Sequence, residues 1–398
     1  MLSSASLRRA LPALSAALPI IIISVTALSV VFAAAEGLDI SAAQAASWIV
    51  ALYGIPGVLS LWLSMRYRQP LILTGNIFAL IFIASLGGQL SYPELVGASV
   101  VAGAIVVLVG ALGLTGRLAA WIPAPIVLGL VAGAVMPYIA GIFTALGDEP
   151  VLVGGAFLAY LLGRRIQGPR LPAILPALIA GLALAGLTGH FGPLPTRMAW
   201  PIPIITLPTF SLHAIATATP VLVVLITIQG NLPSVIFMQS QGYAPPERVI
   251  NAVSGGGTLV GSLLGPMALS IAVLLTPLTA GPDAGDREVR HWSVYISASA
   301  FVLIALLAGV AADLPVLIPL PLLLALAGLS LVGVLASTLQ QITRGPLLLG
   351  PMFAFAIALS RISLLGLGPF FWSLVFGMGI SLLLEQEALK RLRASVSG

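Results

Sequence analysis

Two short stretches decide the fold of this chain: residues 70–77, Pro-Leu-Ile-Leu-Thr-Gly-Asn-Ile, and residues 265–271, Gly-Pro-Met-Ala-Leu-Ser-Ile. Each has a proline where an apolar segment begins. Proline donates no backbone hydrogen bond and disfavours helical geometry in the residue before it. After each proline the chain can run extended for a few residues, which exposes unpaired N–H groups. A half-helix is then expected to start near Thr74 and near Ser270, because both residue types are good helix N-caps.

The composition around these stretches is that of a membrane protein. Of 398 residues, 59% are hydrophobic and 7% are charged, and the mean hydropathy is +1.13. A soluble domain carries roughly 25% charged residues. Soluble enzymes, nucleic-acid binders and secreted disulfide scaffolds are therefore excluded. The apolar runs are continuous and not alternating, which indicates an all-α polytopic protein and not a β-barrel.

At about 20 apolar residues per helical span, the chain has room for fourteen spans, or for twelve with longer loops. Fourteen apolar segments are read from the sequence: 11–35, 42–65, 70–87, 95–116, 120–146, 150–163, 171–190, 211–240, 249–264, 266–281, 291–312, 315–341, 346–360 and 365–384. The two stretches quoted above lie in the third and the tenth of these segments.

The basic residues orient the spans. If the N-terminus starts in the cytoplasm and the spans alternate, all but two of the 17 Lys and Arg residues face the cytoplasm, the exceptions being Arg197 and Arg361. Basic residues resist translocation, so this bias marks the cytoplasmic side. We expect a bacterial inner-membrane protein with both termini in the cytoplasm.

An internal repeat connects the two halves of the chain. A shift of 196 positions brings Pro70 onto Pro266, and the motif Ile-Pro-Ala-Pro at 122–125 recurs as Ile-Pro-Leu-Pro at 318–321. Seven spans per half is an odd number, so the second copy must be inserted upside down. Inverted repeats of this kind are typical of secondary transporters.

The repeat also predicts the domain organisation. A first seven-span repeat covers 1–190, a Pro-rich extracellular connector covers 191–210, an inverted second repeat covers 211–385, and a cytoplasmic tail covers 386–398. The broken third and tenth segments mark the binding site, because in inverted-repeat transporters half-helix N-termini point at anionic substrate groups.

The candidate substrate-binding residues lie in these breaks and in one further polar cluster. The breaks contribute Thr74, Gly75, Asn76, Pro266, Met267 and Ser270. In the alternative interpretation, the Thr and Ser hydroxyls only stabilise a proline kink. The polar cluster contributes Gln229 and Asn231, whose amides need partners in hydrocarbon. They either bind the substrate directly or hold helices together, and the sequence leaves both interpretations open.

Several chemistries are absent from the sequence pattern. No Asp, Glu, Lys or Arg falls at mid-membrane, and the chain has no Cys. No nucleophile–base pair, nucleotide loop or metal-ligand spacing is present. We therefore expect neither an enzyme nor a bound cofactor. The expected partners are a small organic anion, the lipid bilayer and, if transport is coupled, a proton. A homodimer is left open, and nucleic acid is not expected.

Four motifs resemble those of a known family: Leu-Pro-Thr-Phe-Ser-Leu at 207–212, Asn-Leu-Pro at 231–233, Gln-Gly-Tyr-Ala-Pro-Pro at 241–246 and Thr-Ala-Gly-Pro-Asp-Ala at 279–284. With these motifs the chain resembles the benzoate transporter (BenE) family of proton-coupled aromatic-acid symporters. Such proteins are similar in fold to nucleobase and solute carrier 26-like anion transporters. The resemblance implies seven plus seven inverted spans, with segments 1–4 and 8–11 as core and the rest as gate. It further implies a substrate between segments three and ten and an elevator-type movement of the core.

The departures from the family pattern cluster around the expected site. A Trp-Ser-Thr-Pro-Gly run in the third segment is replaced by residues 72–76, Ile-Leu-Thr-Gly-Asn. Gly230 stands where the family tends to have the Gln before Asn-Leu-Pro, and residues 264–266, Leu-Gly-Pro, replace a Gly-Gly-His run.

The sequence therefore predicts a secondary transporter of a small organic anion, such as benzoate or a related aromatic carboxylate. Two alternatives stay open at this point. One is an uncoupled anion or solute permease or channel, and the other is a membrane scaffold or sensor that does not transport.

Overall fold

The structure, a computed structural model, describes residues 4–166, 174–192, 202–360, 362, 364–365 and 367–397. Within these residues helices predominate, and the sheet consists of two three-residue strands. The chain is thus a predominantly helical protein, as its composition predicted. Arg170, Arg197, Arg361 and residues 193–201 of the predicted connector lie outside the described residues.

The helices form two compact units, each made of three stretches of chain. The first unit comprises Met1–Ile72, Tyr138–Ile204 and Leu274–Val332, and the second comprises Leu73–Pro137, Ile205–Val273 and Gly333–Gly398. This division groups the segments differently from the predicted core and gate domains. The assignment of segments to core and gate therefore stays a prediction. The helices α7 (Ala124–Asp148) and α17 (Leu320–Arg344) each contribute residues to both units.

In the first unit, α1 packs on α14, α3 on α14, α2 on α15, and α8 on α9. In addition to parts of α7 and α17, this unit contains the elements α1 (Ser4–Gly37), α2 (Ala42–Ile49), η1 (Val50–Gly54), α3 (Ile55–Tyr67), α8 (Pro150–Ile166), α9 (Ile174–Leu187), α13 (Thr276–Ala280), η5 (Pro282–Ala284), α14 (His291–Leu306), α15 (Ala308–Ala312) and α16 (Leu314–Leu317).

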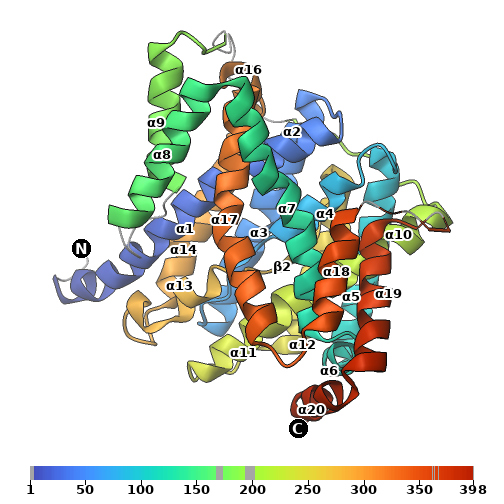
Figure 1. Ribbon diagram of the computed structural model, residues 1–398. Coiled ribbons are helices and arrows are strands. Elements are labelled where there is room, and N and C mark those ends of the chain that lie inside the picture. Colours follow the sequence, from blue (N-terminus) through green and yellow to red (C-terminus); the bar gives the residue numbers. More distant parts are fainter. Residues whose placement is uncertain are drawn as a thin grey trace. The chain divides into compact units, whose positions relative to one another are not determined.

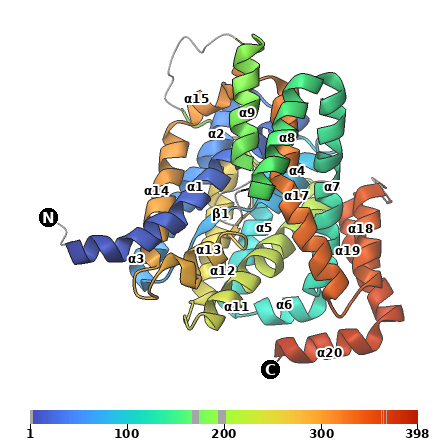
Figure 2. The same cartoon turned by 60° about the vertical axis from the view of Figure 1, so that its left-hand side comes forward.

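In the second unit, α5 packs on α12 and α10, α18 packs on α19, and α6 packs on α20; α18 and α19 run side by side in Figures 1 and 2. In addition to parts of α7 and α17, this unit contains the elements β1 (Leu73–Gly75), α4 (Ile77–Ser85), α5 (Tyr92–Leu112), α6 (Thr115–Trp121), α10 (Leu212–Val224), η3 (Leu225–Asn231), α11 (Leu232–Ser240), α12 (Glu247–Gly261), η4 (Ser262–Leu264), β2 (Leu269–Ile271), α18 (Leu349–Ser360), α19 (Pro369–Leu384) and α20 (Gln386–Ser397).

Six helices among the described residues are long and apolar enough to span a membrane: Pro12–Gly37, Ala42–Tyr67, Tyr92–Leu112, Ala124–Asp148, Leu212–Ser240 and Leu320–Arg344. Two bent pairs raise this number to eight if each pair is one span: His291–Leu306 with Ala308–Leu317, bent by 65°, and Pro369–Leu384 with Gln386–Arg393, bent by 107°. The chain is therefore a multi-pass membrane protein. A total of fourteen spans would require the shorter and broken helices to cross the membrane as well. The number fourteen therefore stays a prediction.

The turn η3 is π-helical and runs directly into α11, whose second residue is Pro233. Proline lacks the N–H group of a regular helical turn and crowds the carbonyl of the turn before it. A wider turn relieves this crowding, and such π-bulges occur frequently at functional sites. In this protein the turn carries Gln229 and Asn231, both of which are buried.

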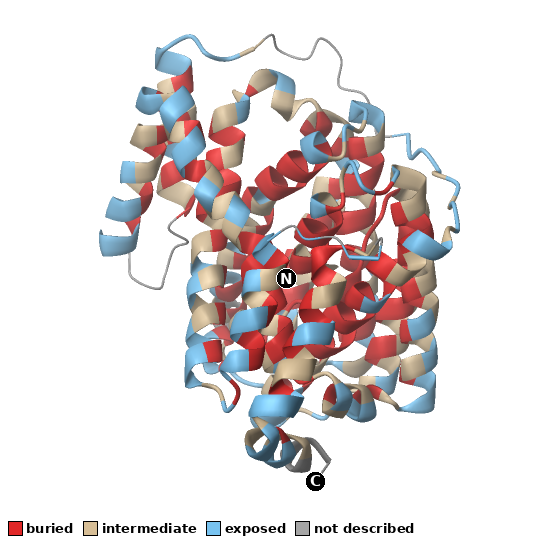
Figure 3. Ribbon diagram, turned by 45° about the vertical axis from the view of Figure 1, so that its right-hand side comes forward, coloured by how far each residue is buried: buried red, intermediate tan, exposed pale blue. Residues whose placement is uncertain are grey.

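The closest backbone crossing between α5 and α12 depends on two glycines. A Cβ atom on Gly255 would lie 2.6 Å from the Gly103 carbonyl oxygen, and one on Gly103 would lie 2.7 Å from the Gly255 carbonyl oxygen. Small residues at helix crossings allow this approach in membranes. Both glycines are buried; Figure 3 colours the buried residues red.

This crossing gives a matched pair of substitutions. Gly255→Ala is expected to destabilise the protein by roughly 1–3 kcal/mol, because the new methyl group overpacks the crossing. Gly256→Ala meets no atom within 4 Å. It should be neutral, or stabilising by up to about 1 kcal/mol through helix propensity. Thermal unfolding in detergent measures both, and equal midpoints for the two variants would contradict the prediction.

Candidate functional site

The two predicted breaks meet in the structure as a pair of strands. Strands β1 and β2 run antiparallel, with Thr74 directly opposite Ser270. The N–H of Asn76 donates to the carbonyl of Ala268 at 2.8 Å and extends the pairing beyond β1. The chain is thus extended after both prolines, as the sequence allowed.

The free edge of β2 is bonded by two side chains. In an antiparallel pair, alternate residues direct their N–H groups away from the partner strand. In β2 these groups are the N–H of Leu269, which donates to Thr258 Oγ1, and the N–H of Ile271, which donates to Asn231 Oδ1, both at 2.8 Å. The strand is therefore held by backbone on one edge and by α12 and η3 on the other.

Asn231 is fully buried, and its amide is saturated by protein groups. Besides the bond from Ile271, its Oδ1 accepts a hydrogen bond from Ser254 Oγ at 3.3 Å. Its Nδ2 donates to Asn251 Oδ1 at 2.9 Å and to Ser254 Oγ at 3.2 Å. Asn251 in turn donates to Thr115 Oγ1 at 3.1 Å. Of the two interpretations left open for Asn231, these bonds favour the one in which it holds elements together.

Asn76 caps the helix that follows β1. Its Oδ1 accepts the N–H groups of Phe78 at 3.0 Å and Ala79 at 3.1 Å. Helix α4 therefore begins at Ile77. The expectation of a helix start near Thr74 was wrong by a few residues, because Thr74 is held in the strand pair.

The amide nitrogen of Asn76 connects the break to the π-helical turn. Its Nδ2 donates to Ser270 Oγ at 3.1 Å, to the Leu225 carbonyl at 3.1 Å and to Gln229 Oε1 at 3.4 Å. Three elements of the second unit, α4, β2 and η3, thus meet at one side chain.

The second break differs from the first. Ser270 does not cap a helix, because it lies in β2 and its hydroxyl donates to the Ile271 carbonyl at 3.2 Å. The next helix, α13, begins only at Thr276 and belongs to the first unit. The expectation of a half-helix start near Ser270 was therefore wrong. Pro266 and Met267 are buried in the chain that leads to β2.

Two side-chain groups at this site are left without protein partners. Within the described residues, neither Thr74 Oγ1 nor Gln229 Nε2 makes a hydrogen bond. Thr74 and Gly75 are half-buried, and Gln229 is 7% exposed. The site therefore offers one hydroxyl and one amide N–H₂ group to a ligand, beside half-buried backbone.

Gly230 sets the distance between η3 and β2. A Cβ atom on this residue would meet the side chain of Ser270, lying 2.5 Å from its Cβ atom. No side chain can be added here without moving the strand. This contact gives a physical reason for the glycine that replaces glutamine before the Asn-Leu-Pro motif.

The buried polar side chains among the described residues are all Ser, Thr, Asn or Gln. No fixed charge thus lies in the described interior. The N-terminus of α4 contributes a partial positive charge, equivalent to about half an elementary charge before the cap offsets it. A small anion is the ligand type that this electrostatic setting favours.

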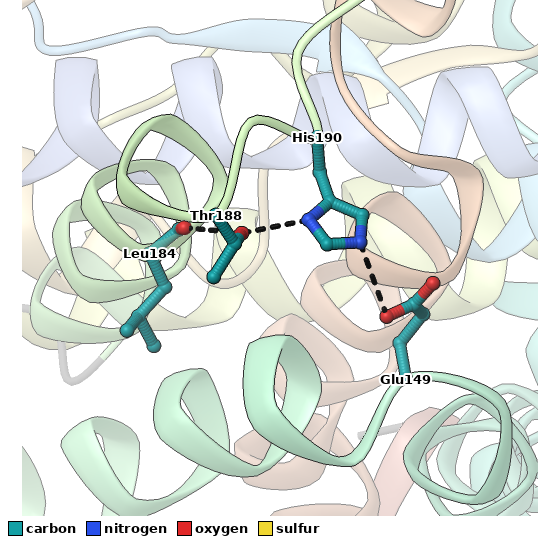
Figure 4. A network of polar contacts seen from close by, with 4 residues as sticks. All are labelled: Glu149, Leu184, Thr188 and His190. Carbon is teal, nitrogen blue, oxygen red and sulfur yellow. Dashed lines mark hydrogen bonds and ion pairs between the residues drawn. The ribbon is translucent and has the colours of Figure 1, made fainter.

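His190, at the end of α9, lies outside the candidate site and makes its own polar contacts. Figure 4 shows His190 between Thr188, whose Oγ1 lies 2.7 Å from its Nδ1, and Glu149, whose Oε2 lies 3.8 Å from its Nε2. The Thr188 hydroxyl donates to the Leu184 carbonyl. His190 is 42% exposed and belongs to the first unit, where it joins the end of α9 to the start of α8.

The first unit has an open pocket of about 430 Å³, but the described residues that line it carry no polar side chain to hold an anion. Its lining residues are all apolar: Val50, Gly54, Ile55, Val58, Leu59, Pro203, Val302, Ala305 and Leu306. The strand pair of the second unit is therefore the stronger candidate site.

Sequence reasoning missed the contribution of α12. Thr258, Asn251 and Ser254 are fully buried and bond to β2 or to Asn231. An Asn in an apolar segment is a detectable signal, because its amide requires partners in the membrane. Thr258 carries no such signal, since a Thr in a helix commonly bonds its own backbone.

The fold is similar to that of two solved membrane proteins. The transmembrane domain of a cyanobacterium bicarbonate transporter, BicA, aligns with a TM-score of 0.58 over 97% of both chains, at 16% identity. The murine anion transporter Slc26a9, in its inward-facing state, aligns with a TM-score of 0.61 over 95% of this chain and 68% of its own, at 13% identity. The fold is shared with these transporters.

The chain belongs to the BenE family, described as benzoate membrane transport protein, whose model matches residues 8–383. It is 29% identical over 354 residues to the benzoate membrane transport protein of Acinetobacter baylyi, covering 88% of this chain and 89% of that protein. It is 27% identical over 353 residues to the inner membrane protein YdcO of Escherichia coli, with the same coverage. The family resemblance seen in the sequence is confirmed, and the chain is a membrane transport protein, not an enzyme.

Proposed function

We propose that this protein is a secondary transporter of a small organic anion, such as benzoate or a related aromatic carboxylate, in the bacterial inner membrane. The observation that carries the proposal is the strand pair with two groups, Thr74 Oγ1 and Gln229 Nε2, that make no hydrogen bond to any described residue. Membership of the benzoate transport family and the anion-transporter fold support the substrate class.

The site that we propose combines direct ligands with a supporting frame. Thr74, Gly75 and Gln229 would contact the carboxylate at the N-terminal end of α4, where the helix dipole favours negative charge. Asn76 and Ser270 would orient Gln229 and Thr74, and Asn231 would position β2. Pro266 and Met267 would form the buried turn behind the strand.

We further propose fourteen spans in two inverted repeats, 1–190 and 211–385, with both termini in the cytoplasm. The register of the strands supports this topology. Thr74 and Ser270 are repeat mates at the offset of 196, and they are also the central pair of the two strands. A two-fold axis that relates inverted halves would pass through such a central pair. The extracellular connector, 191–210, and a homodimer stay predictions.

Proton symport by an elevator-type movement is the mechanism that we propose. The buried polar side chains of the described residues are uncharged, so a substrate that crosses in its protonated form would itself carry the proton. Uptake of benzoate by sealed proteoliposomes, corrected for protein-free vesicles, should acidify the lumen and accelerate with an inward proton gradient. An uptake rate that is independent of pH would contradict proton coupling and favour the alternative of an uncoupled permease. Failure of saturable counterflow would favour a channel, and absence of both flux and ligand stabilisation would favour a scaffold.

Gln229→Ala tests the site directly. The lost hydrogen bond to a charged ligand is expected to raise the KM for benzoate by about tenfold or more. Gln239→Ala, which removes an exposed amide from neighbouring α11, should leave the KM unchanged. Saturable counterflow in proteoliposomes measures both variants. An unchanged KM in Gln229→Ala would remove Gln229 from the proposed site.

A further inference from the structure

We propose that α6 and α20 of the second unit form a binding surface for the headgroups of anionic phospholipids. The inference does not depend on the transported substrate. It rests on the direction of α20, on the separation of its charged and apolar residues, and on its contact with α6.

The direction of α20 suits a helix at the membrane surface. The chain bends by 107° between α19, which is apolar, and Gln386–Arg393 of α20. Figure 2 shows α20 crossing the end of α19. If α19 spans the bilayer, a helix turned by roughly a right angle from it runs along the membrane plane.

The two faces of α20 differ in character. Leu389 is buried at 2% exposure, whereas Lys390 and Arg391 are exposed. Figure 3 shows exposed residues along this helix near the C-terminus. An amphipathic helix with basic residues on its polar face is the pattern of helices that lie in the interface of an anionic membrane.

Helix α6 continues this surface. Arg393 Nε donates to the Ala120 carbonyl at 2.9 Å, which fixes α20 against α6. Arg117 on α6 is exposed, and Trp121 at its end is 74% exposed. Tryptophan is enriched at the level of the headgroups, where its ring is apolar and its N–H remains solvated.

The charges of the surface are predominantly positive. Arg117, Lys390 and Arg391 are exposed, and Glu387 is the acidic residue of α20, with its carboxylate 3.1 Å from Lys390 Nζ. Glu385, at the bend, is the other acidic residue of the surface, and its carboxylate accepts three backbone N–H groups at the start of α18. Leu383 and Leu384, next to the bend, are 76% and 66% exposed. Exposed leucines at the end of a spanning helix suit acyl chains, and the adjacent basic residues suit phosphate. The shared chemistry is that of an anionic phospholipid.

Lipid titration of the purified full-length protein in mixed micelles tests the proposal, with phosphatidylglycerol and phosphatidylcholine as probes. Phosphatidylglycerol should bind preferentially. The double variant Lys390→Ala/Arg391→Ala should lose that preference by about tenfold or more, since each basic residue near an anionic surface contributes several-fold. Glu387→Gln, which removes the opposing charge, should strengthen binding. Thermal unfolding in phosphatidylcholine micelles checks that all variants remain folded.

A charge-matched control separates a local surface from general attraction. Arg164→Ala/Arg165→Ala removes two exposed cations from α8 of the first unit. This variant should retain its preference for phosphatidylglycerol. An equal loss in both double variants, or no preference in the unmodified protein, would overturn the proposal.

Discussion

Gly230→Ala is expected to reduce transport at least tenfold, and to do so more strongly than any other single methyl addition discussed above. The added Cβ atom would overlap Ser270 in β2, and neither partner can yield, because Gly230 lies in a helical turn and Ser270 in a bonded strand. Overpacking of this kind costs roughly 1–3 kcal/mol and displaces backbone. Displacement of β2 moves the groups that face the proposed ligand. Counterflow in proteoliposomes measures the effect.

A double variant distinguishes this contact from a general loss of stability. Ser270→Gly removes the atoms that the new methyl group would meet, so Gly230→Ala/Ser270→Gly should recover part of the transport rate. Such non-additivity is the signature of a direct contact. Gly333→Ala in α17, which meets no atom within 4 Å, is the control and should transport normally. A double variant as inactive as Gly230→Ala would show that the defect lies elsewhere.

Asn231→Ala is expected to produce the largest loss of stability, roughly 2–4 kcal/mol, because it leaves several buried polar groups without partners. The Ile271 N–H loses its acceptor, and Asn251 and Ser254 lose their contacts with the amide. Thermal unfolding in detergent should show a lowered midpoint, accompanied by loss of ligand stabilisation.

Helix α11, which directly follows Asn231, provides the control. Gln239→Ala also removes a carboxamide but at an exposed position, and its midpoint should match that of the unmodified protein. If Asn231→Ala were as stable as Gln239→Ala and lost only substrate affinity, Asn231 would be a ligand of the substrate and not a positioning residue.

The breaks in the fold were predictable from local chemistry. Pro70 and Pro266 allow extended chain, because proline donates no backbone hydrogen bond and disfavours helical geometry in the residue before it irrespective of the surroundings. The helix starts were not predictable to the residue. Thr74 and Asn76 are both good caps, and the choice between them depends on pairing with a strand almost two hundred residues away.

The roles of the polar side chains were only partly predictable. The sequence showed that Asn231 and Gln229 require partners but not which partners they have. Asn231 is saturated by protein groups, whereas Gln229 keeps its Nε2 unbonded within the described residues. That distinction depends on the positions of Asn251 and Ser254 on α12, which helical periodicity alone does not relate to η3.

The strand pair also constrains how the protein can move. Because β1 and β2 are bonded to each other, and β2 is bonded to η3 and α12 through Asn231 and Thr258, separation of these elements would break several buried hydrogen bonds together. The pair should therefore shift as one rigid body during any change of access. If the transport mechanism proposed above holds, the flexibility of the cycle would come from hinges in the chain outside the pair, and a ligand held there would travel with its binding groups unchanged.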